Sequence, residues 1–174
     1  MDDVITIRSC NAQDAEAIMS IGIRTFRDTF DEMNTPENMM LYLNQNFTLK
    51  KIRQEIAEKG STFLFAQQYG KTVGYARIRT SENPKGLTAK APIEIERLYV
   101  DRDYIGKRVG YLLMNPCMEY AREGGHDAVW LGVWEHNERA IAFYKKWGFT
   151  RFGEHTFMLG KDAQTDWLLK KELK

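Results

Sequence analysis

Apolar and polar positions repeat with a helical period in the first third of the chain. Residues 4–9 alternate as in an edge strand, and residues 15–30 then carry apolar side chains at three- and four-residue steps. Thr35 before a proline and Thr48 before a second apolar stripe are typical helix N-caps, and Gly60 ends that stripe. This region therefore predicts one strand followed by three helices.

The apolar period changes to two after this region. TFLFAQQ and TVGYARIR flank a YGK turn and predict an antiparallel hairpin, which a loop at 81–92 follows. The remaining pattern predicts a strand at 93–100, a helix at about 107–124, a strand at 127–133, a helix at 137–147, and strands near 149–159 and 165–173. Because a helix joins strands 93–100 and 127–133, we expect them to be parallel within one mixed α/β sheet covered by helices.

Two details of this pattern make sharper predictions. Pro116 lies inside the helix at 107–124, where its missing N–H should kink or break the helix. Strict alternation along 93–100 predicts two faces, with Glu94, Glu96, Leu98 and Val100 on one and Ile93, Ile95, Arg97 and Tyr99 on the other.

Composition places the chain among ordinary globular proteins. The 174 residues suit a single domain, 1–174, and 43% of them are hydrophobic while 28% are charged. A net charge of +1 gives no electrostatic reason to expect nucleic acid or an anionic membrane as partner. The start MDDVITIRSC is no signal peptide, and no apolar run approaches the ~20 residues of a membrane helix. We expect a soluble, cytoplasmic protein.

The cysteines and histidines do not indicate a metal site. Cys10 and Cys117 are far apart and match no metal or redox spacing, so we expect reduced, buried thiols. The three histidines are scattered along the chain.

The stretch IEIERLYVDRDYIGKRVGYLLM, residues 93–114, has the form strand, glycine loop, helix. Free N–H groups at a helix start bind anions without metal, and Lys107 and Arg108 add positive charge there. Neither the Walker pattern nor GxGxxG is present, and no acidic metal ligand follows. A diphosphate held by backbone amides is therefore favoured over hydrolysed ATP, and an ordinary glycine turn is the alternative.

A second cluster, LGVWEHNERAIAFYKKWGF at 131–149, follows the next strand. Alone, Asn137 is most simply an N-cap and Tyr144 a half-buried core aromatic. Together, NxxAxxFYxxxGF about 30 residues after the strand–loop–helix unit is a specific combination. With it the whole chain resembles the GNAT superfamily of acetyl-CoA-dependent N-acetyltransferases. TFRDTFDEMNTPENMMLYL, IEIERLYV, WLGVWEHNERAIAFYKKWGF and QTD at 164–166 are most similar to the PaiA-type spermidine/spermine acetyltransferases.

The resemblance implies a fold, a cosubstrate and a set of binding residues. The fold would have about seven mainly antiparallel strands with a splayed parallel pair at the centre, and acetyl-CoA would bind there without metal. The pantetheine arm would run along the backbone of Leu98, Tyr99 and Val100. The pyrophosphate would be wrapped by Ile105, Gly106, Lys107, Arg108, Val109 and Gly110. Asn137 and Tyr144 would lie by the pantetheine and the thioester sulfur, with Lys146 reaching the phosphates.

The glycine loop departs from the family pattern Gln/Arg-x-x-Gly-x-Gly/Ala. Ile105 replaces the leading polar residue and Arg108 replaces the middle glycine, whereas Gly106 and Gly110 are kept. Backbone N–H contacts do not depend on side chains, so we expect weakened but real cofactor binding. If position 108 requires a positive φ, a non-glycine residue costs roughly 1 kcal/mol there.

Acetyl transfer to an amine requires a proton acceptor for the amine and a proton donor for the thiolate. Glu96 is the candidate base, acting through water, because an acid occupies the matching position in the polyamine-acetylating relatives. Its alternative role is a structural ion pair with Arg97 or Lys107. Tyr144 is the candidate acid, since a phenol has a pKa near 10.

A polyamine acceptor would require carboxylates spaced along a groove with aromatic walls. The candidates are Asp28, Asp31, Glu32, Glu37, Glu96 and Glu135, with Trp130, Trp134 and Trp167 as aromatic surface and His155 lining the site. Taken singly, each is more simply explained as a solvated charge or a core aromatic. A peptide N-terminus, an amino acid or an aminoglycoside remains an alternative acceptor. The altered loop also leaves open a non-catalytic CoA-binding module, and the family resemblance allows a homodimer.

Overall fold

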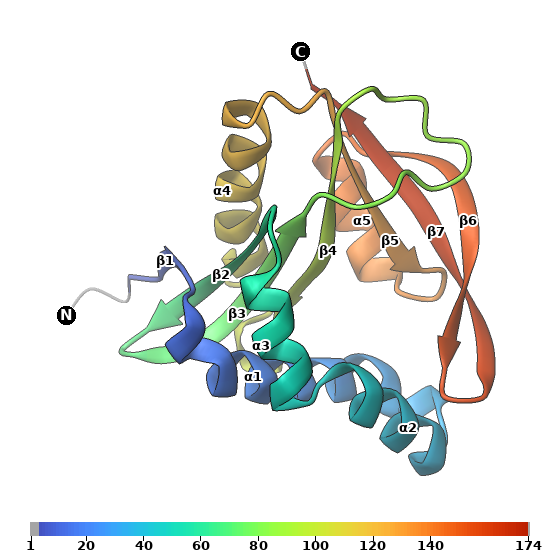
Figure 1. Ribbon diagram of the computed structural model, residues 1–174. Coiled ribbons are helices and arrows are strands. Elements are labelled where there is room, and N and C mark those ends of the chain that lie inside the picture. The colour runs from blue at the N-terminus through green and yellow to red at the C-terminus, as the bar shows by residue number, and fades with distance from the viewer. Residues whose placement is uncertain (1–3, 174) are drawn as a thin grey trace.

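The computed structural model describes residues 4–173, which form a seven-stranded mixed sheet with helices on both faces (Figure 1). The strand order is β1-β2-β3-β4-β5-β7-β6, with β4 and β5 parallel and the other neighbours antiparallel. This confirms the predicted fold class. The strands are β1 (Thr6–Ser9), β2 (Ser61–Gln68), β3 (Lys71–Arg79), β4 (Pro92–Val100), β5 (Ala128–Trp134), β6 (Thr150–Leu159) and β7 (Asp162–Glu172).

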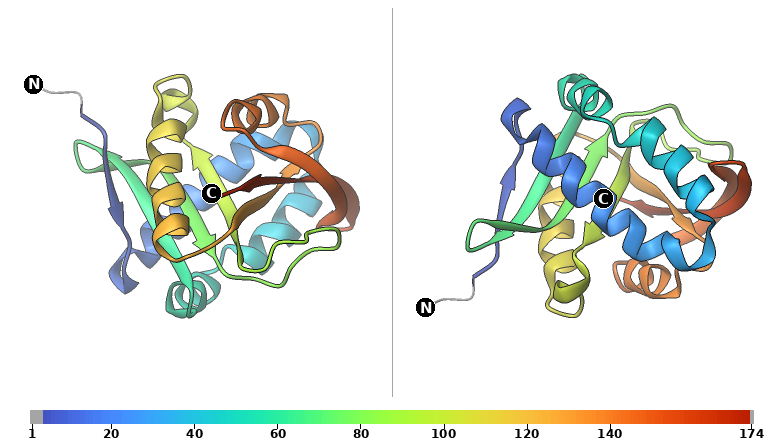
Figure 2. Two further views of the ribbon diagram at one scale, coloured as in Figure 1. Left: turned by 90° about the horizontal axis from the view of Figure 1, so that it is seen from above. Right: turned by 90° about the horizontal axis from the view of Figure 1, so that it is seen from below.

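The helices divide between the two faces of the sheet (Figure 2). One face carries α1 (Ala15–Phe30), α2 (Pro36–Asn46) and α3 (Leu49–Ala57) over a core rich in aromatic side chains. The other carries α4 (Val109–Glu123) and α5 (Glu138–Lys146) over a mainly aliphatic core. Short 3-10 turns, η1 (Ala12–Asp14), η2 (Asp31–Met33) and η3 (Arg102–Tyr104), precede α1, follow it, and follow β4.

Helix starts lie where the capping residues predict them. The Thr35 side chain accepts from the backbone N–H of Asn38, and Thr48 accepts from that of Lys51, each at 3.2 Å. Each contact satisfies a donor that the first turn of a helix leaves free.

Helix α4 continues through Pro116. The helix runs from Val109 to Glu123 without interruption, so the proline does not break it. Proline cannot donate the bond that the carbonyl of Leu112 would accept, which is a local loss inside an otherwise packed helix.

The two parallel strands pair over only three residues. The ladder pairs Pro92 with Ala128, Ile93 with Val129 and Glu94 with Trp130, and it ends there. Beyond that point β4 stays paired with β3, and β5 stays paired with β7 as far as Trp134. The strands therefore diverge, as Figure 1 shows, and the edge of β4 that faces β5 has no partner strand among residues 4–173.

A bulge in β4 changes which side chains share a face. Ile95 lies opposite Ile78 and Arg97 lies opposite Arg77, so Glu96 is an extra residue without its own partner. The predicted strict alternation is therefore wrong. The core beneath α4 and α5 contains Ile93 and Ile95 and also contacts Leu98 and Val100, whereas Tyr99 packs against the core on the α1 face.

Candidate active site

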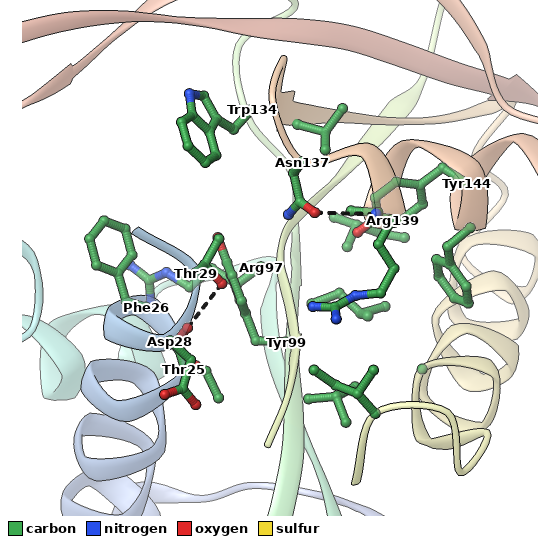
Figure 3. A pocket seen from close by; sticks show the side chains of 18 of the residues that line it. Thr25, Phe26, Asp28, Thr29, Arg97, Tyr99, Trp134, Asn137, Arg139 and Tyr144 are labelled. Carbon is green, nitrogen blue, oxygen red and sulfur yellow. Dashed lines mark hydrogen bonds between the residues drawn. The ribbon is translucent and has the colours of Figure 1, made fainter. Parts of the chain in front are cut away.

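A cavity of about 1150 Å³ lies where β4 and β5 diverge. Figure 3 shows side chains of α1 and α5 facing each other across β4, and the loop before α4, β5, β6 and β7 complete the walls. The volume is at the upper end of small-ligand sites, which is room for two reactants rather than one.

The loop between β4 and α4 ends in a free helix N-terminus. Gly106 has φ +84° and Arg108 has φ +66°, so the chain turns twice through the left-handed region. The N–H groups of residues 108–111 have no backbone acceptor within residues 4–173. Together with the helix dipole they form an anion-binding site that opens into the cavity.

Gly106 and Gly110 have different structural roles in this loop. A Cβ on Gly106 would meet nothing within 4 Å, so glycine serves only the positive φ there. A Cβ on Gly110 would lie 3.3 Å from the Phe143 ring, so this glycine permits close approach of α4 and α5.

Asp101 fixes the base of the loop. Its N–H donates to the carbonyl of Val73 at 2.8 Å, and its carboxylate accepts from the N–H of Asp103 at 3.2 Å. Arg24 on α1 pairs with the same carboxylate at 3.1 Å. The buried aspartate thus ties the loop to both the sheet and α1.

Four cationic side chains line the cavity at this end: Arg102, Arg108, Arg139 and Lys146. Lys107 does not line it, and its ammonium lies 5.0 Å from the centroid of the Tyr104 ring. The Arg108 guanidinium lies over Tyr111, 4.8 Å from the ring centroid. Sequence reasoning missed Arg102 and Arg139, which belong to no motif.

The remaining predicted cofactor residues all line the cavity: Leu98, Tyr99, Val100, Ile105, Gly106, Val109, Gly110, Asn137 and Tyr144. Asn137 caps α5 by accepting from the N–H of Ala140 at 3.2 Å, which sets where the helix begins.

Tyr144 is held in the wall by packing. Its ring contacts Phe143 and Phe149, with centroids 5.3 and 5.7 Å away. The residue is buried, and its side chain lines the cavity. Burial, and to a lesser degree the neighbouring Cys117 thiol, raises the pKa of Tyr144 above its usual value. The phenol therefore stays protonated and can donate to a group in the cavity.

Glu96, at the bulge, is surrounded by guanidinium groups. Its carboxylate lies 2.5 Å from Arg77 Nη1 and 3.7 Å from both Arg79 Nη2 and Arg97 Nη2. Burial opposes its charge, but the attraction of Arg97, Arg77 and Arg79 is stronger, and the pKa of Glu96 is lowered. A carboxylate with a low pKa attracts a cation well and accepts a proton poorly at neutral pH.

Two further carboxylates, Glu55 and Glu58, neutralise part of the charge of these arginines. Arg97 donates to both oxygens of Glu55, at 2.7 and 3.0 Å. Arg77, which is 1% exposed, pairs with Glu55 and Glu58 as well as Glu96. These ion pairs support the alternative role of Glu96, that of a structural ion-paired carboxylate. Its partners are three arginines rather than one cation.

Aromatic side chains of α1, α2, β5 and β6, and of the residue after α2, form the wall away from the glycine loop: Phe26, Phe30, Tyr42, Phe47, Trp134 and Phe157. Phe26 stacks on Phe30 and on Tyr42 with centroids 4.4 Å apart in each pair, and Trp134 lies 5.0 Å from Phe30. Trp130 and Trp167 do not line the cavity.

The predicted acceptor carboxylates separate into two groups. Asp28 lines the cavity and pairs with Arg102 at 3.3 Å, and Glu96 lines it at the bulge. Asp31, Glu32, Glu37 and Glu135 do not line it. Glu94, Asp166 and His155 do, at the end near the aromatic wall. The sequence analysis places His155 in the site, whereas Asp166 occurs there only within the QTD phrase at 164–166.

Residues 4–173 contain no cluster of three or more His, Cys, Asp or Glu side chains placed to hold a metal ion. No helix in the same range has the length and apolarity to cross a membrane.

The site can thus hold an anion at one end, an apolar chain along the free edge of β4, and a cation at the other end. Comparisons with known proteins identify the relatives of this chain. The model of the acetyltransferase (GNAT) family matches residues 24–149. An uncharacterized N-acetyltransferase of Lactobacillus delbrueckii subsp. lactis is 38% identical, over 97% of this chain and 98% of that protein.

More distant relatives have named activities. The N-alpha-acetyltransferase RimI of Mycobacterium tuberculosis is 31% identical over 64% of this chain and 68% of its own. The spermidine N(1)-acetyltransferase of Thermoplasma acidophilum is 24% identical over 83% of this chain and 88% of its own. A crystal structure of the PaiA N-acetyltransferase of T. acidophilum with coenzyme A superimposes with a TM-score of 0.81 at 20% identity, covering 98% of this chain and 99% of that one.

A family model that spans most of the chain and a relative similar over its full length identify the family. The chain belongs to the acetyltransferase (GNAT) family and is an acetyl-CoA-dependent N-acetyltransferase.

Proposed function

We propose that the chain acetylates a primary amine of a polyamine of the spermidine or spermine class. The observation that carries the proposal is the polarity of the cavity. Cationic side chains and free helix amides lie at the glycine-loop end, whereas Glu94, Glu96 and Asp166 lie at the far end beside the aromatic wall. Arg97 also lines that end, but its charge is balanced by the two hydrogen bonds to Glu55, and Glu94 in turn accepts from Arg79 Nε at 2.8 Å.

The cofactor would lie along the free edge of β4. The pyrophosphate would accept hydrogen bonds from the N–H groups of residues 108–111, and Arg139 and Lys146 would neutralise phosphate charge. The pantetheine amides would pair with backbone groups of residues 98–100, as a partial extra strand does. The acetyl group would then reach the point where β4 and β5 diverge.

Tyr144 would donate its proton to the departing thiolate. Tyr144 lines the cavity and its phenol stays protonated, so it can donate a hydrogen bond to the sulfur as negative charge develops there. The assignment of Glu96 as the base stays a prediction. Its low pKa and three arginine partners favour attraction of the ammonium group over removal of the proton.

A polyamine suits the far end because it combines ammonium groups with aliphatic spans. The carboxylates would hold the ammonium groups, and Phe26, Phe30 and Trp134 would cover the methylene groups and add cation–π attraction. A peptide N-terminus is the main competitor, because one relative is an N-alpha-acetyltransferase.

The direct test is thiol release from acetyl-CoA with spermidine, spermine, n-butylamine and an alanine-terminated peptide as acceptors. We expect saturable release with the polyamines and a kcat/KM at least ~10-fold above that of n-butylamine, since butylamine lacks the second ammonium group. Added salt should reduce this advantage by screening the carboxylates. Release with the peptide alone would replace the polyamine assignment by a peptide one.

Tyr144→Phe should lower kcat by about 100-fold or more while leaving acetyl-CoA affinity within about twofold, because only the proton donor is lost. The matched control is Tyr120→Phe on the outer side of α4, which does not line the cavity and should not change either constant. Wild-type turnover in Tyr144→Phe would remove the acid role.

Two substitutions of Arg108 distinguish the effect of backbone strain on acetyl-CoA affinity from the effect of the side-chain charge. Arg108→Gly removes both the side chain and the left-handed strain at φ +66°, whereas Arg108→Ala removes the side chain alone. We expect calorimetry to show that Arg108→Gly binds acetyl-CoA as tightly as the wild type or more tightly, and that Arg108→Ala does not bind more tightly. A large loss of affinity in both variants would instead make the guanidinium a phosphate ligand.

A further inference from the structure

The acceptor ammonium group must transfer a proton to a base. Glu96 is a poor base, because three arginines lower the pKa of its carboxyl group. His155 on β6 and Asp166 on β7 supply a second titratable pair in the same cavity. The two residues lie opposite each other in the β6–β7 ladder, and His155 Nε2 is 3.4 Å from Asp166 Oδ2. They come from the final hairpin, beyond the region that the family model matches.

Gly132 lets this pair reach the opening between β4 and β5. A Cβ at Gly132 on β5 would lie 3.2 Å from Asp166 Oδ2 and 3.6 Å from His155 Nε2 and Cε1. Gly132 is two residues past Trp130, where the parallel ladder ends. The carboxylate and imidazole therefore lie over β5 just where it has left β4.

The contact with Asp166 selects the tautomer of the imidazole. With Nε2–H donating to the carboxylate, Nδ1 keeps its lone pair. Nδ1 has no hydrogen-bond partner among residues 4–173. The side chain is 45% exposed, whereas that of Asp166 is 18% exposed, so the imidazole can pass a proton on to solvent.

We propose that His155, oriented by Asp166, is the catalytic base that takes the proton from the acceptor ammonium group, directly or through one water. The proposal rests on the proposed amine acetylation but not on the amine being a polyamine. The nitrogen loses two protons in the reaction. His155 Nδ1 takes the first and releases it to solvent, and the lone pair that this exposes forms the C–N bond to the thioester carbon. As the C–S bond breaks, Tyr144 protonates the thiolate, and the second nitrogen proton restores the tyrosine.

The surroundings of the imidazole fit this role. Asp166 from β7 and Glu94 from β4 are the charged groups that act on it, and Gly132 on β5, which lies close to the imidazole, has no side chain. The bond to Asp166 raises the pKa of His155 above 6.5, against the opposing effect of burial, and the charges of Asp166 and Glu94 add to the increase. Activity that needs the neutral imidazole should be present above this pKa and be lost as the pH falls through it.

The test is the pH dependence of kcat/KM for the wild type, His155→Gln, Asp166→Asn and Glu96→Gln, measured with whichever amine the wild type acetylates best. The matched control is His126→Gln, because this histidine lies before β5 and does not line the cavity. Retention of the wild-type rise in Tm with acetyl-CoA serves as the check that each variant is folded.

We expect the wild-type kcat/KM to fall on the acid side with a midpoint above 6.5, the ordinary histidine value. Asp166→Asn should move that midpoint down. His155→Gln should lower kcat/KM by about 100-fold or more at pH 7.5, and the deficit should shrink towards pH 10 as the amine loses its proton in solution. A purely structural histidine would not produce such pH-dependent rescue. His126→Gln should follow the wild type.

A wild-type profile in His155→Gln, together with loss of the acid limb in Glu96→Gln, would overturn the proposal and return the base to Glu96. If His155→Gln fails the folding check, an unshifted midpoint in Asp166→Asn overturns it by itself. Acetylation of the alanine peptide but not of polyamines would refute the polyamine assignment alone, since the profiles are then measured with the peptide. Absence of turnover with every amine would contradict both.

Discussion

The early end of the β4–β5 ladder is the constraint on which the site depends. Three residue pairs join the parallel strands, and each strand then follows its antiparallel partner away from the other. Backbone donors and acceptors on the freed edge of β4 must be satisfied by something other than a strand, because leaving them buried and unpaired is costly. An extended chain with amide groups is a fitting partner, and the pantetheine arm of acetyl-CoA has that form.

Two local features determine what lies on either side of this opening. On β4, the bulge at Glu96 returns Leu98 and Val100 to the aliphatic core and places the carboxylate among Arg77, Arg79 and Arg97. On β5, the absence of a side chain at Gly132 admits the carboxylate of Asp166. The cofactor end is tied to the sheet and to α1 by the contacts of Asp101.

The sequence predicts the features that depend on local pattern. Element order, the parallel pair and the caps at Thr35 and Thr48 follow from periodicity and N-cap chemistry, and the structure confirms them. The bulge at Glu96 could not be predicted, because it exists only in the register with β3. The same holds for the meeting of His155 with Asp166, which depends on the register of the β6–β7 hairpin. Lys107 has the right charge for the loop, but its side chain packs over Tyr104.

The most direct measurement is a crystal structure of the protein with coenzyme A. The account predicts the pyrophosphate against the N–H groups of residues 108–111, pantetheine amides paired with the backbone of residues 98–100, and the sulfur within hydrogen-bond reach of the Tyr144 hydroxyl. Coenzyme A bound outside the opening between β4 and β5, or with its sulfur remote from Tyr144, would contradict the central claim that the divergence of these strands creates the transfer site.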